Sequence, residues 1–204
     1  KMRTTKNRRI ALFPGAFRPP HQAHYAAILD LASQIEIDEV VVIIANRSRY
    51  LPGTTKALDA DVARRVLKVY LQDVPKVRLE LAQHDAISQA LAYLDKAVPG
   101  AALVFCIGEA DFERGDDRFE QLLSQRNHDG ISVTVVPAAT GSMPIRATTL
   151  REALAVGEAK REEFNAALPS HLSSEEREQV WLLCRKGLRS VRDIIAEKLL
   201  TMLA

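Results

Sequence analysis

The sequence predicts an α/β fold, a doubly wound parallel sheet of five strands with a C-terminal helical appendage. Short apolar runs alternate with segments long enough to form a crossover helix, which is typical of right-handed βαβ units. Three of the runs are apolar almost throughout, as expected of parallel strands covered on both faces. After residue 136 this alternation ends and only segments of helical character follow.

The five expected strands are rich in β-branched and apolar residues. They cover residues 9–13, 39–45, 77–81, 102–107 and 131–136. The segments between them have the length of crossover helices, which we expect over residues 20–35, 58–71, 86–97 and 114–124. Beyond the last strand we expect helices over 148–155, 161–167, 174–184 and 188–203, separated by Gly157, Pro169 and Gly187.

Length and composition indicate one globular domain with a short appendage. Of the 204 residues, 47% are hydrophobic and 26% are charged, which excludes global disorder. We place the α/β domain at residues 8–156 and the helical extension at 157–204. The formal net charge of +2 does not indicate a polyanionic partner, so we do not expect nucleic-acid binding. A homo-oligomer remains open.

Cysteine content and hydropathy bear on the compartment. The two cysteines have neither a disulfide framework nor a metal-ligand spacing, which fits a reducing environment. No segment approaches the ~20 apolar residues that a membrane-spanning helix requires. We therefore expect a cytoplasmic protein with no membrane contact.

The loop after the first strand has the composition of an anion-binding site. Gly15 and Ala16 are small enough to let backbone amides approach a ligand. His21 and His24 stand three residues apart in the first turn of the next helix, where the macrodipole and free N–H groups favour phosphate. Two histidines at this spacing could also be a solvated pair, or one could be a helix cap. Their position directly after a buried strand favours donors to a phosphate chain.

Two motifs carry a resemblance to a known family. Residues 13–24, FPGAFRPPHQAH, resemble the G-S-F-x-P-x-H-x-G-H loop of the HIGH-type nucleotidyltransferase superfamily, which includes nicotinamide and nicotinate mononucleotide, pantetheine-phosphate and cytidylyl transferases. Residues 145–151, IRATTLR, resemble the I-S-S-T-x-I-R signature of the same family. Two motifs in the right order are far more specific than either alone. The resemblance spans residues 8–156 and implies a Rossmann-like fold.

The resemblance also implies a reaction, the transfer of a nucleoside monophosphate from a triphosphate to a phosphomonoester with release of pyrophosphate. We expect AMP from ATP and nicotinamide mononucleotide as the acceptor, a step of NAD biosynthesis. Mg²⁺ would be held chiefly by the triphosphate, with no protein ligands assigned. One alternative is a cytidylyltransferase that uses CTP and a sugar or alcohol phosphate.

The second alternative is a nucleotide-binding module that has lost the transfer reaction. Two departures from the family pattern motivate it. Ala23 replaces the glycine between the two histidines, and Arg146 replaces a serine of the second motif.

The resemblance implies roles for residues of both motifs. His24 corresponds to the histidine that contacts the α-phosphate, His21 to its partner on the triphosphate, and Arg151 to the arginine that holds the β,γ-phosphates. These three are the expected catalytic residues. The expected nucleotide-binding residues are Phe13, Gly15, Ala16, Phe17, Gly108, Asp111, Ile145, Arg146 and Thr148.

The acceptor site is expected at a basic segment after the second strand. Arg47, Arg49 and Lys56 follow that strand, and Arg18 occupies a variable position of the first motif. In the resembling family this region lines the acceptor site. A mobile basic loop and a solvated Arg18 are the alternatives.

Overall fold

The computed structural model describes residues 8–108, 117–126, 129–139, 145–190, 192–193 and 195–196. Its internal contacts divide the chain into two compact units. The first unit comprises Lys1–Gly15, Ala26–Ala45 and Asp73–Ser142, and the second comprises Ala16–Tyr25, Asn46–Gln72 and Met143–Ala204. The division into domains at residue 156 stays a prediction.

Among the described residues, no helix is both long enough and apolar enough to cross a bilayer.

The first unit is built on a five-stranded, all-parallel sheet in the order β5-β2-β1-β6-β7. The chain runs outward from central β1 in both directions, which confirms the doubly wound α/β fold. All five predicted strands are present, as β1 (Arg9–Gly15), β2 (Glu39–Ile44), β5 (Val77–Leu81), β6 (Ala102–Ile107) and β7 (Ser132–Pro137).

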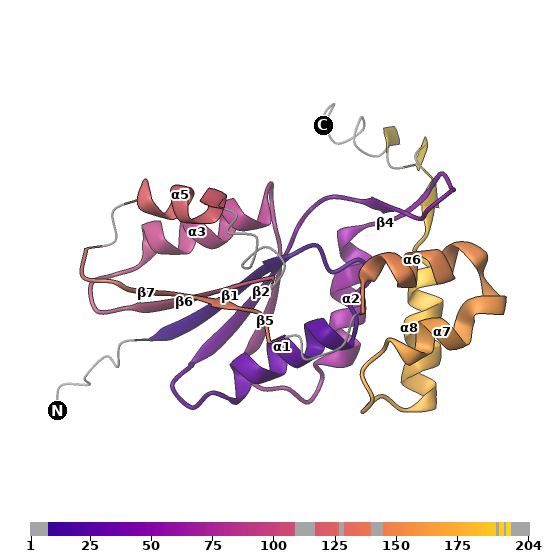
Figure 1. Cartoon of the computed structure of the whole chain (residues 1–204), viewed down its shortest axis with the longest axis horizontal. Helices are drawn as coiled ribbons and strands as arrows, with labels where there is room; N and C mark the ends of the chain where they lie inside the picture. The colour runs from indigo at the N-terminus through magenta and orange to yellow at the C-terminus, as the bar shows by residue number, and fades with distance from the viewer. Residues whose placement is uncertain are drawn as a thin grey trace. The chain divides into compact units, whose positions relative to one another are not determined.

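Helices cover both faces of this sheet. The helices α3 (Ala86–Lys96) and α5 (Asp117–Ser124) lie on one face, and α1 (Gln22–Ser33) lies on the other (Figure 1). On the first face, Leu91 and Phe119 pack with Phe105 in a buried apolar core. Burial on both faces explains why the central strands are apolar throughout. Residues 114–116, which the sequence places at the start of a helix, lie outside the described residues.

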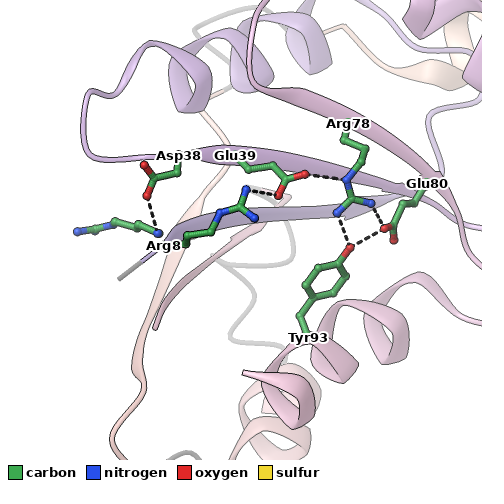
Figure 2. Close-up of polar contacts among 7 residues, drawn as sticks. Arg8, Asp38, Glu39, Arg78, Glu80 and Tyr93 are labelled. Atoms are coloured by element: carbon green, nitrogen blue, oxygen red, sulfur yellow. Dashed lines mark hydrogen bonds and ion pairs between the residues drawn. The ribbon is translucent and has the colours of Figure 1, made fainter. Parts of the chain in front are cut away.

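A network of polar side chains ties edge strand β5 to β2 and α3 (Figure 2). Glu39 of β2 accepts hydrogen bonds from Arg8 at 3.1 Å and from Nε of Arg78 at 2.7 Å. The Arg78 guanidinium also pairs with Glu80 and donates to the Tyr93 hydroxyl at 2.9 Å. Each partly exposed pair contributes only about 0–1 kcal/mol. The charges also blunt an edge strand that could otherwise pair with another chain, so the network stabilises the fold.

The second unit combines helices with a small antiparallel sheet. Its helices are α2 (Ala60–Tyr70), α6 (Ala147–Val156), the short 3-10 helix η1 (Glu158–Lys160), α7 (Arg161–Ala166) and α8 (Ser174–Lys186). The sheet has the order β3-β4-β8, from β3 (Arg49–Tyr50), β4 (Lys56–Leu58) and β8 (Arg189–Ser190). Capping decides where two helices start. Asp59 accepts from the Val62 amide at the start of α2, and Ser173 forms a capping box with Glu176 at the start of α8.

The small sheet corrects the prediction at two places. Leu58, expected at the start of a helix, is the last residue of β4. The helix expected over 188–203 does not begin at residue 188, because Arg189 and Ser190 pair with β4. Ser190 Oγ then accepts from the Asp193 amide at 3.2 Å, an N-cap contact at the start of the described helical residues. Helical backbone is described at 192–193 and 195–196, and the remainder of this predicted helix lies outside the described residues.

Candidate functional site

The loop between β1 and α1 buries two polar side chains. Arg18 is 1% exposed and His21 is 6% exposed. The chain turns just before them at Phe17, whose φ of 53° lies in the left-handed region that side chains seldom adopt. Arginine is seldom buried so completely unless its charge is compensated. A buried arginine beside a buried histidine therefore marks this loop as a candidate anion site.

The two histidines of the loop are stacked on one another. Their ring centroids lie 3.8 Å apart with an interplanar angle of 29°, and the Phe17 ring packs edge-on against His24 at 4.9 Å. The His21 amide donates to Nδ1 of His24 at 3.2 Å. Since Nδ1 accepts this hydrogen bond, the proton of a neutral His24 ring sits on Nε2. His24 is thereby held as an N–H donor at Nε2.

Burial keeps both imidazoles neutral near pH 7. It lowers the pKa of His21 from 6.5 to about 4. Burial, and then the neighbouring His21, lower the pKa of His24 well below its usual value. Nδ1 of His21 is buried and makes no hydrogen bond with any residue that the structure describes. An unsatisfied buried polar atom costs about 1–3 kcal/mol, which a bound ligand would offset.

The second motif meets the first at Arg151. This residue lies in the second turn of α6, whose N-cap is Arg146. Arg151 Nη1 donates to the main-chain carbonyl of Arg18 at 2.7 Å, and Nη2 donates to Thr148 Oγ1 at 2.9 Å. These contacts use two of the five N–H donors of a guanidinium. Residues 16–24 of the first motif and the second motif thus lie together within the second unit.

A third arginine, from the small sheet, lies close to this site. Burial is the main cause that lowers the pKa of Arg18, to about 10, and the charge of Arg49 lowers it further. The pKa of Arg151 is also lowered, again by burial first and then by Arg49. Asp59 acts on Arg18 in the opposite direction. Three positive charges gathered beside two neutral imidazoles favour binding of an anion with several charges.

The structure brings together only part of the predicted set. The cluster comprises Phe17, Arg18, His21, His24, Arg49, Thr148 and Arg151. Ala16 and Ile145 flank it in sequence and are half-buried. Arg47, Lys56 and Arg146 are exposed, and the contacts of the described residues do not join them to the cluster. Arg146 makes no side-chain capping bond.

Four predicted nucleotide-binding residues belong to the first unit or cannot be placed. Phe13 is buried in β1, and the Gly15 carbonyl at the end of that strand accepts from the Ala45 amide at 2.8 Å. Gly108 follows β6 and is half-buried. Asp111 lies outside the described residues.

Two amides at the start of α1 are already hydrogen-bonded within the protein. The Gln22 amide donates to the carbonyl of Ala167 at 2.9 Å. The His21 amide is likewise used, by His24. Ala23, which departs from the family pattern, is 3% exposed. Its methyl group is therefore covered by the protein.

Sequence reasoning missed Asp59 and the small sheet around Arg49. The signal for a hairpin was present, because Pro52 and Gly53 separate β3 from β4 and Gly53 adopts a φ of 67°. Asp59 stands just before a helical pattern, which is a cap signature. The electrostatic effect of Asp59 on Arg18 depends on the three-dimensional structure and has no local signal in the sequence.

The donor set does not fit a metal ion held by the protein. Within the described part of the chain, no group of three or more His, Cys, Asp or Glu residues could hold a metal. The clustered side chains are imidazoles and guanidinium groups, whereas Mg²⁺ requires oxygen ligands. No chemical step is therefore assigned to a protein-bound metal.

No family model matches the sequence. Among curated proteins, the chain is similar to the "Probable nicotinate-nucleotide adenylyltransferase" of Campylobacter jejuni subsp. jejuni serotype O:23/36 (strain 81-176), with 27% identity over 139 residues, 60% of this chain and 75% of the relative. The protein of the same name from Campylobacter jejuni (strain RM1221) gives the same values. A third, from serotype O:6 (strain 81116 / NCTC 11828), is 26% identical over 135 residues, 58% of this chain and 72% of the relative. These matches confirm the resemblance to the nicotinate mononucleotide adenylyltransferase-like proteins of the HIGH-type nucleotidyltransferase superfamily.

Proposed function

We propose that this chain is an adenylyltransferase that transfers AMP from ATP to a pyridine mononucleotide and releases pyrophosphate. The names of its curated relatives support this activity. The observation that carries the proposal is the hydrogen bond from Arg151 to the Arg18 carbonyl, beside the stacked histidines. It supports a single polyphosphate site made from both motifs.

The residues of the cluster suit the charges that change in this reaction. An oxygen of the acceptor phosphate attacks the α-phosphorus, the bond from that phosphorus to the bridging oxygen breaks, and pyrophosphate leaves with the electron pair. The attacking phosphate oxygen is already an anion, so no base has to remove a proton. Positioning and charge stabilisation then supply most of the catalysis.

His24 is the group we assign to the α-phosphate. Its Nε2–H is a fixed donor, because Nδ1 is occupied by the His21 amide. A donor aimed at a phosphate oxygen stabilises the transition state more than the ground state as charge accumulates there. His21 is assigned to the triphosphate through its ring, and Arg151 to the β,γ-phosphates, with Thr148 holding the guanidinium. Mg²⁺ enters as part of the substrate, bound to the triphosphate.

Arg18 and Arg49 are assigned to the acceptor, and their charge bears on its identity. The sequence alone favoured nicotinamide mononucleotide. Nicotinate mononucleotide carries an additional carboxylate, which is a better partner for a group of arginines. Together with the names of the relatives, this charge leads us to propose nicotinate mononucleotide as the preferred acceptor.

A substrate panel tests the proposal. Pyrophosphate release and product mass are measured for ATP and CTP, each against nicotinate mononucleotide, nicotinamide mononucleotide, phosphopantetheine and a sugar phosphate. We expect a dinucleotide from ATP and nicotinate mononucleotide, and catalytic efficiency at least about tenfold lower with nicotinamide mononucleotide. Production from CTP and a sugar phosphate would instead establish a cytidylyltransferase. Tight nucleotide binding with no product from any pair would establish a binding module.

A further inference from the structure

The C-terminal strand β8 is paired to the segment that carries Arg49. In the small sheet, β4 is the middle strand. On one side Arg49 of β3 lies opposite Leu58 of β4, and on the other side Arg189 of β8 lies opposite Ala57. A hairpin of two short strands is only marginally stable alone. The third strand therefore contributes to holding Arg49 in place.

Asp59 connects this sheet to the buried loop of the first motif. It directly follows β4, and its Oδ1 accepts from the Val62 amide at 3.0 Å, which caps α2. Its Oδ2 lies 3.7 Å from Nη1 of Arg189. The same carboxylate acts on the charge of Arg18. Arg189 thus forms an ion pair with the carboxylate whose charge acts on the buried arginine of the site.

Gly187 lets the chain reach β4 from the end of α8. A Cβ at this position would lie 2.3 Å from Val62 Cγ2 and 2.8 Å from the Leu183 carbonyl oxygen. Both distances are far shorter than van der Waals contact, so no larger residue fits without movement of α2 or α8. Its φ of -82° is ordinary, and the requirement for glycine is one of space alone. Two residues later the chain forms β8.

The end of β8 is fixed by its own side chains. Ser190 Oγ donates to Asp193 Oδ2 at 2.6 Å, and the Ser190 amide donates to the same oxygen at 3.2 Å. These bonds turn the chain into the helical residues at 192–193. The strand is therefore anchored on both sides, by Gly187 before it and by Asp193 after it.

We propose that residues 187–190 are a positioning element of the site, with Arg189 as its positioning residue. Through β4 and Asp59 this element holds Arg49 and Arg18 in place for the phosphate of the acceptor. The proposal rests on the proposed function and adds to it a part for the C-terminal extension. It predicts that damage to the element weakens acceptor binding and leaves the α-phosphate chemistry of His24 intact.

The kinetic test compares Arg189→Ala with Lys186→Ala. Lys186 is an exposed cation at the end of α8, so its removal changes net charge equally without breaking the contact to Asp59. For Arg189→Ala we expect the KM for nicotinate mononucleotide to rise about fivefold or more, with kcat and the KM for ATP within about twofold. Arg189→Lys should recover part of the loss, and Lys186→Ala should match the wild type.

Two outcomes would overturn the proposal. One is an unchanged acceptor KM in Arg189→Ala. The other is an equal rise in the KM for both substrates together with a lowered melting temperature, which would mean a general structural role. Gly187→Ala is expected to reproduce the acceptor effect. If that variant does not fold, Arg189→Ala decides the question alone.

Amide hydrogen exchange gives a readout that does not depend on activity. In Arg189→Ala, exchange at Ala57 and Leu58 of β4 should be faster by about tenfold, with no change in Lys186→Ala. Unchanged protection of β4 would overturn the proposal.

The proposed function and the positioning role can be contradicted separately. A wild-type chain that makes no dinucleotide contradicts the proposed function, whereas an active wild type with a normal Arg189→Ala variant contradicts only the positioning role.

Discussion

Arg151 donates a hydrogen bond from Nη1 to the main-chain carbonyl of Arg18 at 2.7 Å, across 133 positions of sequence. Each residue belongs to one of the two motifs that resemble the nucleotidyltransferase signatures. The contact forms through protein groups alone, so the guanidinium is positioned before any substrate arrives. Such preorganisation removes part of the entropic cost of assembling a transition state.

Replacing Arg151 should reduce catalysis strongly. Arg151→Ala removes the charge assigned to the β,γ-phosphates, and we expect kcat/KM to fall about 10²-fold or more in a pyrophosphate-release assay. Arg151→Lys keeps the charge but not the forked geometry, and should recover only a small part. Arg65→Ala is the matched control, because Arg65 is an exposed arginine of α2 that is not part of the cluster. An equal loss in both alanine variants would argue against a specific role for Arg151.

His24→Ala should affect turnover more than binding. We expect kcat to fall about 10²-fold, with the affinity for ATP, measured by calorimetry, within a few-fold of wild type. The reason is that the Nε2–H donor acts chiefly on charge that develops in the transition state. His171→Ala serves as the control. His171 is an exposed histidine that stacks at 4.4 Å on Tyr25, the residue that follows His24 in the sequence. Unchanged turnover in His24→Ala would remove His24 from the mechanism.

Thr148 should act by holding Arg151. Thr148→Val keeps the shape of the side chain but cannot accept the hydrogen bond from Nη2. We expect the KM for ATP to rise about three- to tenfold, as for the loss of one hydrogen bond. Thr148→Ser retains the hydroxyl and should restore the wild-type value. If the serine variant is as impaired as the valine variant, the hydroxyl is not the group that matters.

Buried His21 should make the protein sensitive to acid. Folding lowers its pKa from 6.5 to about 4, so the unfolded chain binds more protons than the folded chain in this interval. The free energy of unfolding that depends on a neutral His21 is present in full above about pH 6.5, and it is lost as the pH falls toward about 4. Between about pH 7.5 and 5, His21 accounts for about 2 kcal/mol of lost stability. Urea unfolding at both pH values should show a loss smaller by that amount in His21→Gln, and equal losses would contradict the burial of a neutral imidazole.

The sequence predicted the large sheet well because its strands carry their own signal. The run in β2 is apolar from Val40 to Ile44, and each of these residues is completely buried. Both motif loops could also be recognised, since each contains several residues of fixed type in a fixed order.

The small sheet could not be predicted in the same way. Strands β3 and β8 have two residues each, too few to show an alternating pattern. The partner of Arg189 is Ala57, far away in the sequence, so pairing at β8 is decided by tertiary structure. The sequence also does not distinguish Arg47 from Arg49, since both are arginines of the same basic segment. Only the structure places Arg49 near Arg18.

A double-mutant cycle tests most directly whether His24 and Arg151 act on one triphosphate. The rate of pyrophosphate release with ATP and nicotinate mononucleotide is measured for the wild type, His24→Ala, Arg151→Ala and the double variant. If both groups serve the same transition state, the double variant should be within about tenfold of the weaker single variant, because residues that act as a unit are strongly non-additive. Wild-type rates in either single variant, or losses that multiply fully in the double variant, would contradict a shared site.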